Sequence, residues 1–331
     1  MADRSRRLQL LAMKLAALAR DHGATDVRAV PGEFGIGAAL LAGTQAWVLV
    51  EDEPGRGLGP AVAWSIRRQA TELQLVAELA TGTLARRAAA FTMPIEVWHV
   101  AERTLLPAIA EPLPEPPPLP TEHAQFGPVI AAGGATPVVE FGVLTGEVAG
   151  LEVCRVVTDD HTGGHRLDVG IGAHDREAFQ LLHGDRPKVE AIAGVVAAVA
   201  VHRVPGAPGH PLNRLGRSRA LRALLIADPT RIGATEVVPV DPPLPRPNVK
   251  DDVPCVAIAT IAGVATTVVC SAGVDLDAVP FAVDARLATG VTPCLVVVTV
   301  GDDLPIQHEL AAALIDPVRF ITVDPLVTAS P

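Results

Sequence analysis

The chain has 331 residues, of which 49% are hydrophobic and 19% are charged, and its formal net charge at pH 7 is −10. This length and composition indicate a globular protein with room for two or three domains, and they argue against a disordered chain. The acidic balance disfavours a protein that coats nucleic acid through charge alone, although a local basic patch is compatible with it.

Nothing in the sequence is typical of a secretory leader or a membrane span. The first apolar segment carries several basic residues, and no small-residue cleavage site follows it. The longest apolar runs, such as 192–201, are too short to cross a bilayer. The four cysteines form no CxxC pair and lie in apolar runs, which is typical of reduced, buried thiols. Because reduced thiols are typical of the cytoplasm, we expect a cytoplasmic protein. Only three of the 27 basic residues are lysines, a bias that is typical of GC-rich bacteria.

One short phrase occurs three times along the chain. It reads GATDV at 23–27, GATPV at 134–138 and GATEV at 233–237. Each copy follows a helix-like segment and opens a strand-like one. The sequence therefore predicts an α/β fold made of three diverged repeats of an α-β-β-β-α-β unit, with mixed sheets flanked by helices.

The first repeat unit, 1–106, has the clearest periodicity. Apolar residues at helical spacing predict its first helix, and alternating or continuous apolar runs predict its strands. The predicted elements are a helix over 4–21, strands over 27–30, 36–41 and 47–50, a helix over 58–69, a strand over 73–77, a helix over 84–91 and a strand over 95–100.

A proline-rich linker over 107–120 follows the first unit. Seven of its fourteen residues are proline, so it cannot pack as a helix or an inner strand. We expect an extended polyproline spacer, with a proline-rich peptide ligand as the alternative.

The last segment, 214–331, repeats the order of the first, and the middle segment, 121–213, repeats only its start. In the last segment we predict strands over 256–261, 266–270, 295–299 and 320–323, and helices over 276–288 and 310–314. In the middle segment we predict helices over 122–132 and 188–202, another from 175, and strands over 138–141, 151–157 and 166–171. In the middle unit, a different sequence thus replaces the C-terminal part of the repeat.

The middle segment carries charges where the other two copies have apolar strands. These residues are Glu140, Glu147, Glu152, Arg155 and Asp168. Burying an unpaired charge is unfavourable. Either one face of this sheet is exposed to solvent, or the charges line a polar or metal-binding cleft. Strand alternation predicts that Arg155 and Glu152 point to opposite faces.

A basic stretch without any acid spans 202–222. Guanidinium groups at its spacing could grip phosphates, and the alternative is a solvated helix face that pairs with acids elsewhere. The candidate phosphate or nucleic-acid ligands are Arg203, His210, Arg214, Arg217 and Arg219.

The order of helix, three strands, helix and strand resembles the PD-(D/E)xK, or restriction-endonuclease-like, nuclease fold. The resemblance implies an acid on the second strand and an acid-x-Lys on the third, which together bind a divalent metal that activates water. In the middle segment these positions are Glu152 and Asp168-Val169-Gly170, so glycine stands where the family has lysine. The resemblance therefore implies a degenerate member.

These features lead to three functional expectations. The first is a non-catalytic interaction or nucleic-acid-associated protein without a cofactor. Its expected partner is nucleic acid or another protein, and it is not expected to bind a membrane. The second is a metal-dependent phosphodiesterase whose catalytic candidates are Glu152, Asp168 and Glu147, with Mg²⁺ or Mn²⁺ bound by Glu152 and Asp168. The third is a small-molecule sensor with its ligand in the middle cleft.

Overall fold

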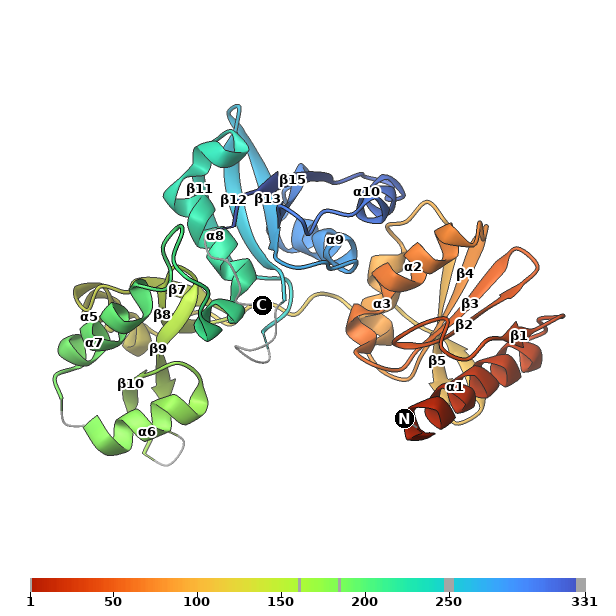
Figure 1. The fold of residues 1–331 in the computed structure, drawn as a ribbon, viewed down its shortest axis with the longest axis horizontal. Helices are drawn as coiled ribbons and strands as arrows, with labels where there is room; N and C mark the ends of the chain where they lie inside the picture. Colours follow the sequence, from red (N-terminus) through yellow and green to blue (C-terminus); the bar gives the residue numbers. More distant parts are fainter. Residues whose placement is uncertain (1, 160–161, 184–185, 247–252, 326–331) are drawn as a thin grey trace. The chain divides into compact units, whose positions relative to one another are not determined.

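Helices flank three β-sheets in the part of the chain that the structure describes (Figure 1). The structure is a computed structural model, and it describes residues 2–159, 162–183, 186–246 and 253–325. Within these ranges the sheets have six, four and five strands. The predicted class, α/β with mixed sheets flanked by helices, is confirmed. None of the helices in these ranges is both long and apolar enough to cross a membrane.

The first sheet has the strand order β1-β2-β3-β4-β5-β6. Its elements are α1 (Ala2–Asp21), β1 (Arg28–Ala29), β2 (Gly37–Ala42), β3 (Gln45–Val50), η1 (Pro54–Arg56), α2 (Leu58–Arg67), β4 (Glu72–Ala77), α3 (Thr81–Ala88), β5 (Ile95–Ala101) and β6 (Thr104–Pro107). Strands β3, β4 and β5 run parallel, and the other pairs are antiparallel. The short edge strand β6 was not predicted, because its sequence merges into the proline-rich segment.

Both faces of β3 are buried. Trp47 and Leu49 belong to the same core cluster as Leu15 of α1, so α1 covers one face of the sheet. Val48 and Val50 point to the other face and are also buried. Burial on both sides explains why this strand is a continuous apolar run rather than an alternating one.

The second sheet is an antiparallel meander with the order β10-β9-β8-β7. Its elements are α4 (Thr121–Ala124), α5 (Gly127–Ala132), β7 (Thr136–Glu140), β8 (Val143–Val148), β9 (Leu151–Thr158), β10 (His165–Val169), α6 (Ala173–His183) and α7 (Lys188–Ala200). Ile130 of α5 and Ile192 of α7 pack in one core cluster with Leu151 and Val153 of β9. The prediction of three strands was wrong here, because β8 contains Gly146 and Glu147 and so lacks an apolar run.

The third sheet has the order β11-β12-β13-β14-β15. The elements of this part of the chain are η2 (Pro211–Arg214), α8 (Arg217–Ala227), η3 (Pro229–Ile232), β11 (Ala234–Val240), β12 (Cys255–Ile261), β13 (Val264–Ser271), α9 (Ala278–Thr289), β14 (Cys294–Thr299), α10 (Pro305–Ala312) and β15 (Arg319–Val323). Strand β13 pairs antiparallel with β12 and parallel with β14. Strand β3 has the same two kinds of neighbour in the first sheet. A common origin of the two sheets stays a prediction.

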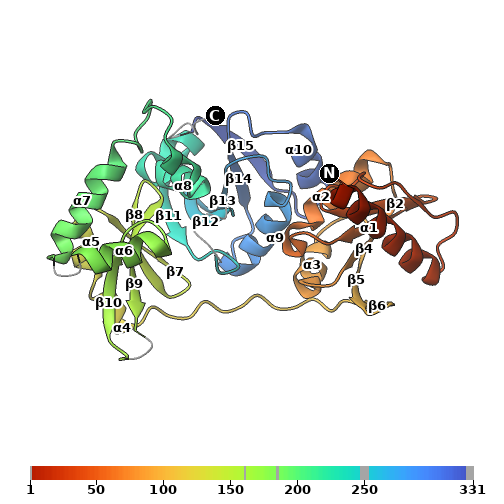
Figure 2. The ribbon, with the colours of Figure 1, turned by 60° about the horizontal axis from the view of Figure 1, so that its bottom comes forward.

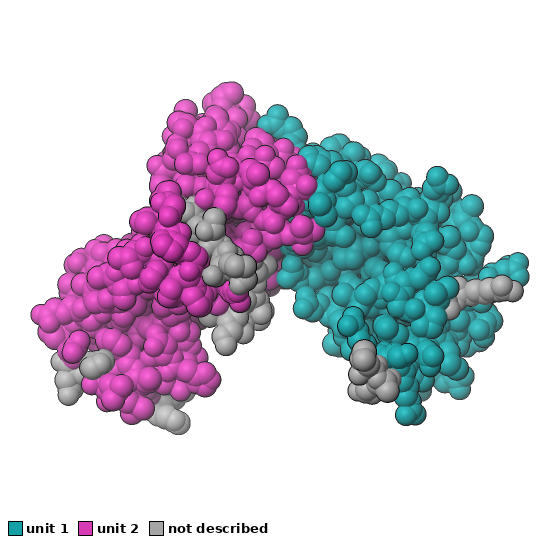
Figure 3. Space-filling view, viewed as in Figure 1, with its two compact units in different colours: residues 1–112, 275–284, 304–319 teal, residues 113–274, 285–303, 320–331 magenta. Residues whose placement is uncertain are grey.

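The chain forms two compact units, which Figure 3 colours separately. Unit 1 contains residues 1–112, 275–284 and 304–319, and unit 2 contains residues 113–274, 285–303 and 320–331. The second sheet and most of the third belong to unit 2. The predicted boundary at 106 falls inside β6, and those at 120 and 213 lie between sheets; all three stay predictions. Residues 108–120 contain no helix or strand, as Figure 2 shows.

Within unit 1, one aspartate just before α9 and one in its middle bind the helices that follow the first sheet's central strands. The carboxylate of Asp284 accepts hydrogen bonds from Arg86 Nε at 2.8 Å and Arg87 Nε at 2.7 Å. Asp277 accepts one from the N–H of Gly59 in α2 at 2.7 Å. A Cβ on Gly59 would lie 2.2 Å from the carbonyl oxygen just before Asp277, so this contact requires glycine.

Candidate functional site

The acids and arginines that the sequence singled out meet inside unit 2. Arg219 Nη1 of α8 lies 2.6 Å from Glu147 Oε1 on β8, and Arg222 Nη1 lies 2.7 Å from Glu140 Oε1 on β7. Arg219 also binds Glu140 through Nη2. All four side chains are nearly or fully buried. The acidic residues on the strands of the middle segment therefore form ion pairs with arginines of the basic stretch over 202–222.

Strand register and helix spacing together create this arrangement. Glu140 pairs with Val143 and Thr136 pairs with Glu147, so alternation places Glu140 and Glu147 on the same face of the β7–β8 hairpin. Arg219 and Arg222 are three residues apart, which places them on the same side of α8. One face of the hairpin thus meets one face of the helix.

Two glycines allow α8 to approach the turn between β8 and β9. A Cβ on Gly150 would lie 2.3 Å from the carbonyl carbon of Arg219. Gly216, which precedes α8, has a φ of 57° and lies so close to the carbonyl of Gly150 that a Cβ would come within 2.9 Å of its oxygen. Larger residues here would push the arginines away from the strand carboxylates.

The pKa values of the two carboxylates in this network shift in opposite directions. Burial acts to raise the pKa of Glu140, but Arg222 and Arg219 hold it below its ordinary value. Burial raises the pKa of Glu147 above its ordinary value, and Arg219 and Arg222 only partly oppose the shift. Glu140 is therefore the firmly ionised member of the pair.

A second group of arginines surrounds Glu152 of β9, whose side chain is 1% exposed. Its oxygens accept hydrogen bonds from Arg155 Nε and Nη2 at 2.9 Å each, from Arg176 Nη1 at 2.9 Å and from Arg246 Nη2 at 3.1 Å. Burial acts to raise the pKa of Glu152, but these arginines hold it below its ordinary value.

The prediction that Arg155 and Glu152 point to opposite faces was wrong. Gly146 of β8 pairs with Cys154, whereas the next residue, Glu147, pairs with Glu152. Strand β9 therefore contains one extra residue at this point, a β-bulge. The extra residue interrupts the alternation and brings the Arg155 guanidinium to Glu152.

Asp168 of β10 is bound by a different arginine. Its Oδ1 accepts a hydrogen bond from Arg166 Nε at 2.8 Å, and Arg166 also lies 2.7 Å from Asp159. The described ranges contain no group of three or more His, Cys, Asp or Glu side chains that could hold a metal ion together. The surroundings of Glu152 do not fit a divalent cation, because three guanidinium groups already occupy its oxygens.

The predicted phosphate ligands do not form a common surface. Arg203 and Arg219 are buried, and Arg214 is exposed. Arg217 Nη2 lies 3.5 Å from Asp302. The His210 ring stacks on another histidine at a centroid distance of 3.7 Å, and its Nδ1 accepts a hydrogen bond from a backbone N–H.

Arg222, Arg176 and Arg246 complete the two networks but were not among the candidate site residues. Arg222 could have been found, because it ends the same basic stretch and lies three residues after Arg219, a spacing that puts both on one side of a helix. Arg246 lies in a proline-rich loop, where no periodicity marks it.

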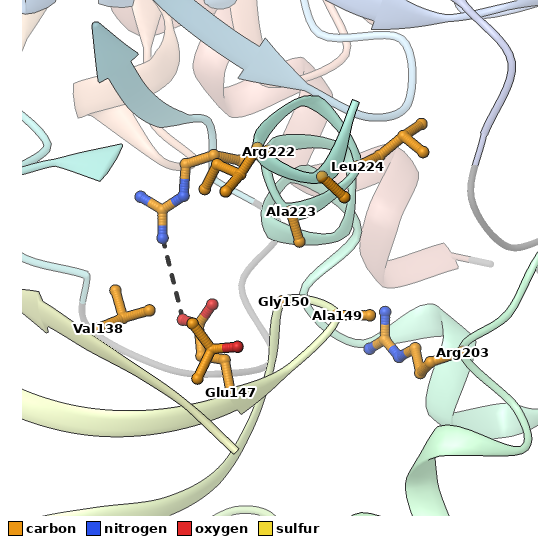
Figure 4. A pocket seen from close by; sticks show the side chains of 11 residues that line it. Val138, Glu147, Ala149, Gly150, Arg203, Arg222, Ala223 and Leu224 are labelled. Atoms are coloured by element: carbon orange, nitrogen blue, oxygen red, sulfur yellow. Dashed lines mark ion pairs between the residues drawn. The ribbon is translucent and has the colours of Figure 1, made fainter. Parts of the chain in front are cut away.

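A pocket of about 330 Å³ lies beside the first network, between β7, β8 and α8. Figure 4 shows Arg222 and Glu147 on one side of the pocket, joined by an ion pair of 3.9 Å, and Arg203 on the other side beside Ala149.

No family model, curated protein or solved structure in the three comparisons matches the chain.

Proposed function

We propose that this is a non-catalytic interaction protein, built from nuclease-like α/β units whose carboxylates have structural roles. The main support comes from Glu152, the acid that the nuclease resemblance assigns to metal binding. Three arginines donate hydrogen bonds to this one carboxylate, and both of its oxygens accept them. A catalytic cation would need the same oxygens and would be repelled by the same guanidinium groups.

The glycine at the position of the nuclease lysine gives independent support. Gly170 has a φ of 135°, which side-chain-bearing residues rarely adopt. A Cβ at this position would lie 2.9 Å from the backbone nitrogen of Arg176 and 2.9 Å from Asp175 Oδ2. The backbone at residue 170 therefore disfavours a lysine, which supports the proposal of a degenerate site.

Among possible partners, another protein has more support than nucleic acid. Of the predicted phosphate ligands, Arg219 is bound by Glu140 and Glu147 and Arg203 is buried, so neither can reach a phosphate backbone. Of the other three candidates, His210 stacks on another histidine, Arg217 lies 3.5 Å from Asp302 and Arg214 is exposed, and so few contacts would give only weak binding to a phosphate backbone.

The test is a cleavage assay on single-stranded and double-stranded DNA and RNA with Mg²⁺ or Mn²⁺. We expect the wild-type protein to cleave none of these substrates. A Glu152→Ala, Asp168→Ala double variant serves as the control for contaminating nucleases. Metal-dependent cleavage by the wild type that the double variant lacks would show that the protein is an enzyme and would overturn the proposal.

A further inference from the structure

The pocket in unit 2 contains a buried arginine whose hydrogen bonds are incomplete. Arg203 is 3% exposed and lines the pocket (Figure 4). Its Nη2 donates to the carbonyl oxygens of Leu212 at 3.2 Å and Leu215 at 2.5 Å. Its Nε and Nη1 have no hydrogen-bond partner in the described part of the chain. Buried N–H donors without acceptors are strongly unfavourable, so these atoms indicate a missing partner.

The nearby carboxylates do not supply that partner. Glu147 Oε1 lies 2.6 Å from Arg219 and 3.9 Å from Arg222, and Glu140 is bound by the same two arginines. Burial lowers the pKa of Arg203 to about 10, and the charge of Glu147 only partly opposes this. The guanidinium therefore stays charged at neutral pH in a site that does not neutralise it.

The charge balance around the pocket leaves one positive charge uncompensated. Of the charged side chains that line the pocket, the carboxylate of Glu147 faces the guanidinium groups of Arg203 and Arg222. Nη2 of Arg222, which also lines the pocket, lacks a hydrogen-bond partner among the described residues as well. The pocket thus offers free donors and needs a single negative charge.

The rest of the pocket wall is mostly apolar. Val138 of β7, Leu224 and Ile226 of α8 and several alanines line it. A volume of about 330 Å³ is at the lower end of the range for small-molecule sites. An inorganic ion would leave most of this wall without contacts.

We propose that the pocket binds a small monoanionic carboxylic acid with a short, branched apolar chain. Its carboxylate accepts hydrogen bonds from Arg203, and its chain packs against Val138, Leu224 and Ile226. This ligand would supply both the acceptor and the charge that the fold leaves out. The site lies apart from Glu152 and Asp168, so the proposal goes beyond the interaction role and can fail or succeed independently of it.

The experiment titrates the full chain with 4-methylpentanoate by isothermal calorimetry in a chloride-free buffer. The comparison probes are the neutral 4-methylpentanamide and inorganic phosphate. We expect saturable binding of 4-methylpentanoate and binding of the amide that is weaker by at least about tenfold, because the amide forms no charge-assisted hydrogen bonds. Equal binding of the amide, tighter binding of inorganic phosphate, or no saturable binding of 4-methylpentanoate in the millimolar range would overturn the proposal.

Two variants assign the binding to this pocket. Arg203→Met should abolish 4-methylpentanoate binding, and Arg231→Met is the matched control, because it removes an exposed arginine of the same unit. Ala223→Leu fills the pocket from α8 and leaves every charge in place, so it should also abolish binding even if Arg203→Met fails to fold. Unchanged binding by a folded Arg203→Met variant, or by Ala223→Leu, would overturn the proposal.

Discussion

The carboxyl group of Asp277 is buried in unit 1 and has a strongly shifted pKa. Burial raises this pKa to about 7 from an ordinary value of 3.8. Arg87, whose Nη1 lies 3.8 Å from Asp277 Oδ2, opposes the shift, as do Arg56 and the N–H of Gly59, whereas Asp275 adds to it. The group therefore titrates near neutral pH, at a point where the start of α9 meets α2.

This shift predicts a pH-dependent stability for the wild-type protein. Because the folded pKa lies above the unfolded value, the contribution of Asp277 is fully present below about pH 4 and is lost as the pH rises through 7. Asp277→Asn keeps an oxygen for the Gly59 N–H and removes the titration. We expect the variant to be more stable than the wild type at pH 8 by on the order of 2 kcal/mol, and to lose most of this advantage at acidic pH.

Urea unfolding across this pH range measures the difference. The control is Asp21→Asn, which changes an exposed aspartate of the same unit and should follow the wild-type curve. Parallel curves for Asp277→Asn and the wild type would contradict the prediction.

At the scale of elements, α8 is held to the β7–β8 hairpin by buried ion pairs. Removing one partner leaves an uncompensated buried charge, so Arg219→Met and Glu140→Gln, which remove a partner of the firmly ionised carboxylate or that carboxylate itself, should each lower the free energy of unfolding by on the order of 3 kcal/mol. The double variant should lose less than the sum, with a coupling of about 1–3 kcal/mol.

A double-mutant cycle followed by urea unfolding gives this coupling. The matched control is the exposed pair of Arg231 and Asp228, which are 3.2 Å apart and should couple by less than about 1 kcal/mol. Similar coupling in both cycles would mean that burial adds nothing to the α8 contact.

The sequence predicted most elements of the first and third sheets, because their apolar runs follow helix or strand periodicity. It missed β8, where Gly146 and Glu147 break the pattern, since a close contact with Cys154 and an ion pair with α8 determine that strand. It also identified the strand acids and the arginine stretch separately. That they bind each other depends on contacts between residues far apart in the chain, which periodicity does not report.

At the scale of the whole molecule, unit 1 is built from three separate stretches of chain. A fragment of residues 1–112 would lack 275–284 and 304–319, leaving Arg86 and Arg87 without Asp284. We expect this fragment to unfold at a lower urea concentration than unit 1 in the full chain, or without cooperativity.

Circular dichroism of the fragment during urea unfolding, with the full chain as reference, tests this expectation. A cooperative transition of the fragment at the same midpoint as the full chain would instead support the predicted independent domain over residues 1–106.

The same division has a consequence during biosynthesis. Residues 1–112 leave the ribosome first, but the segments that complete unit 1 are translated only after most of unit 2. At a translation rate of about 5–20 residues per second, Asp284 is synthesised on the order of ten seconds after Arg86 and Arg87. During that time the nascent chain exposes the part of unit 1 that residues 275–284 and 304–319 later cover. We therefore expect chaperones that bind nascent chains to bind it.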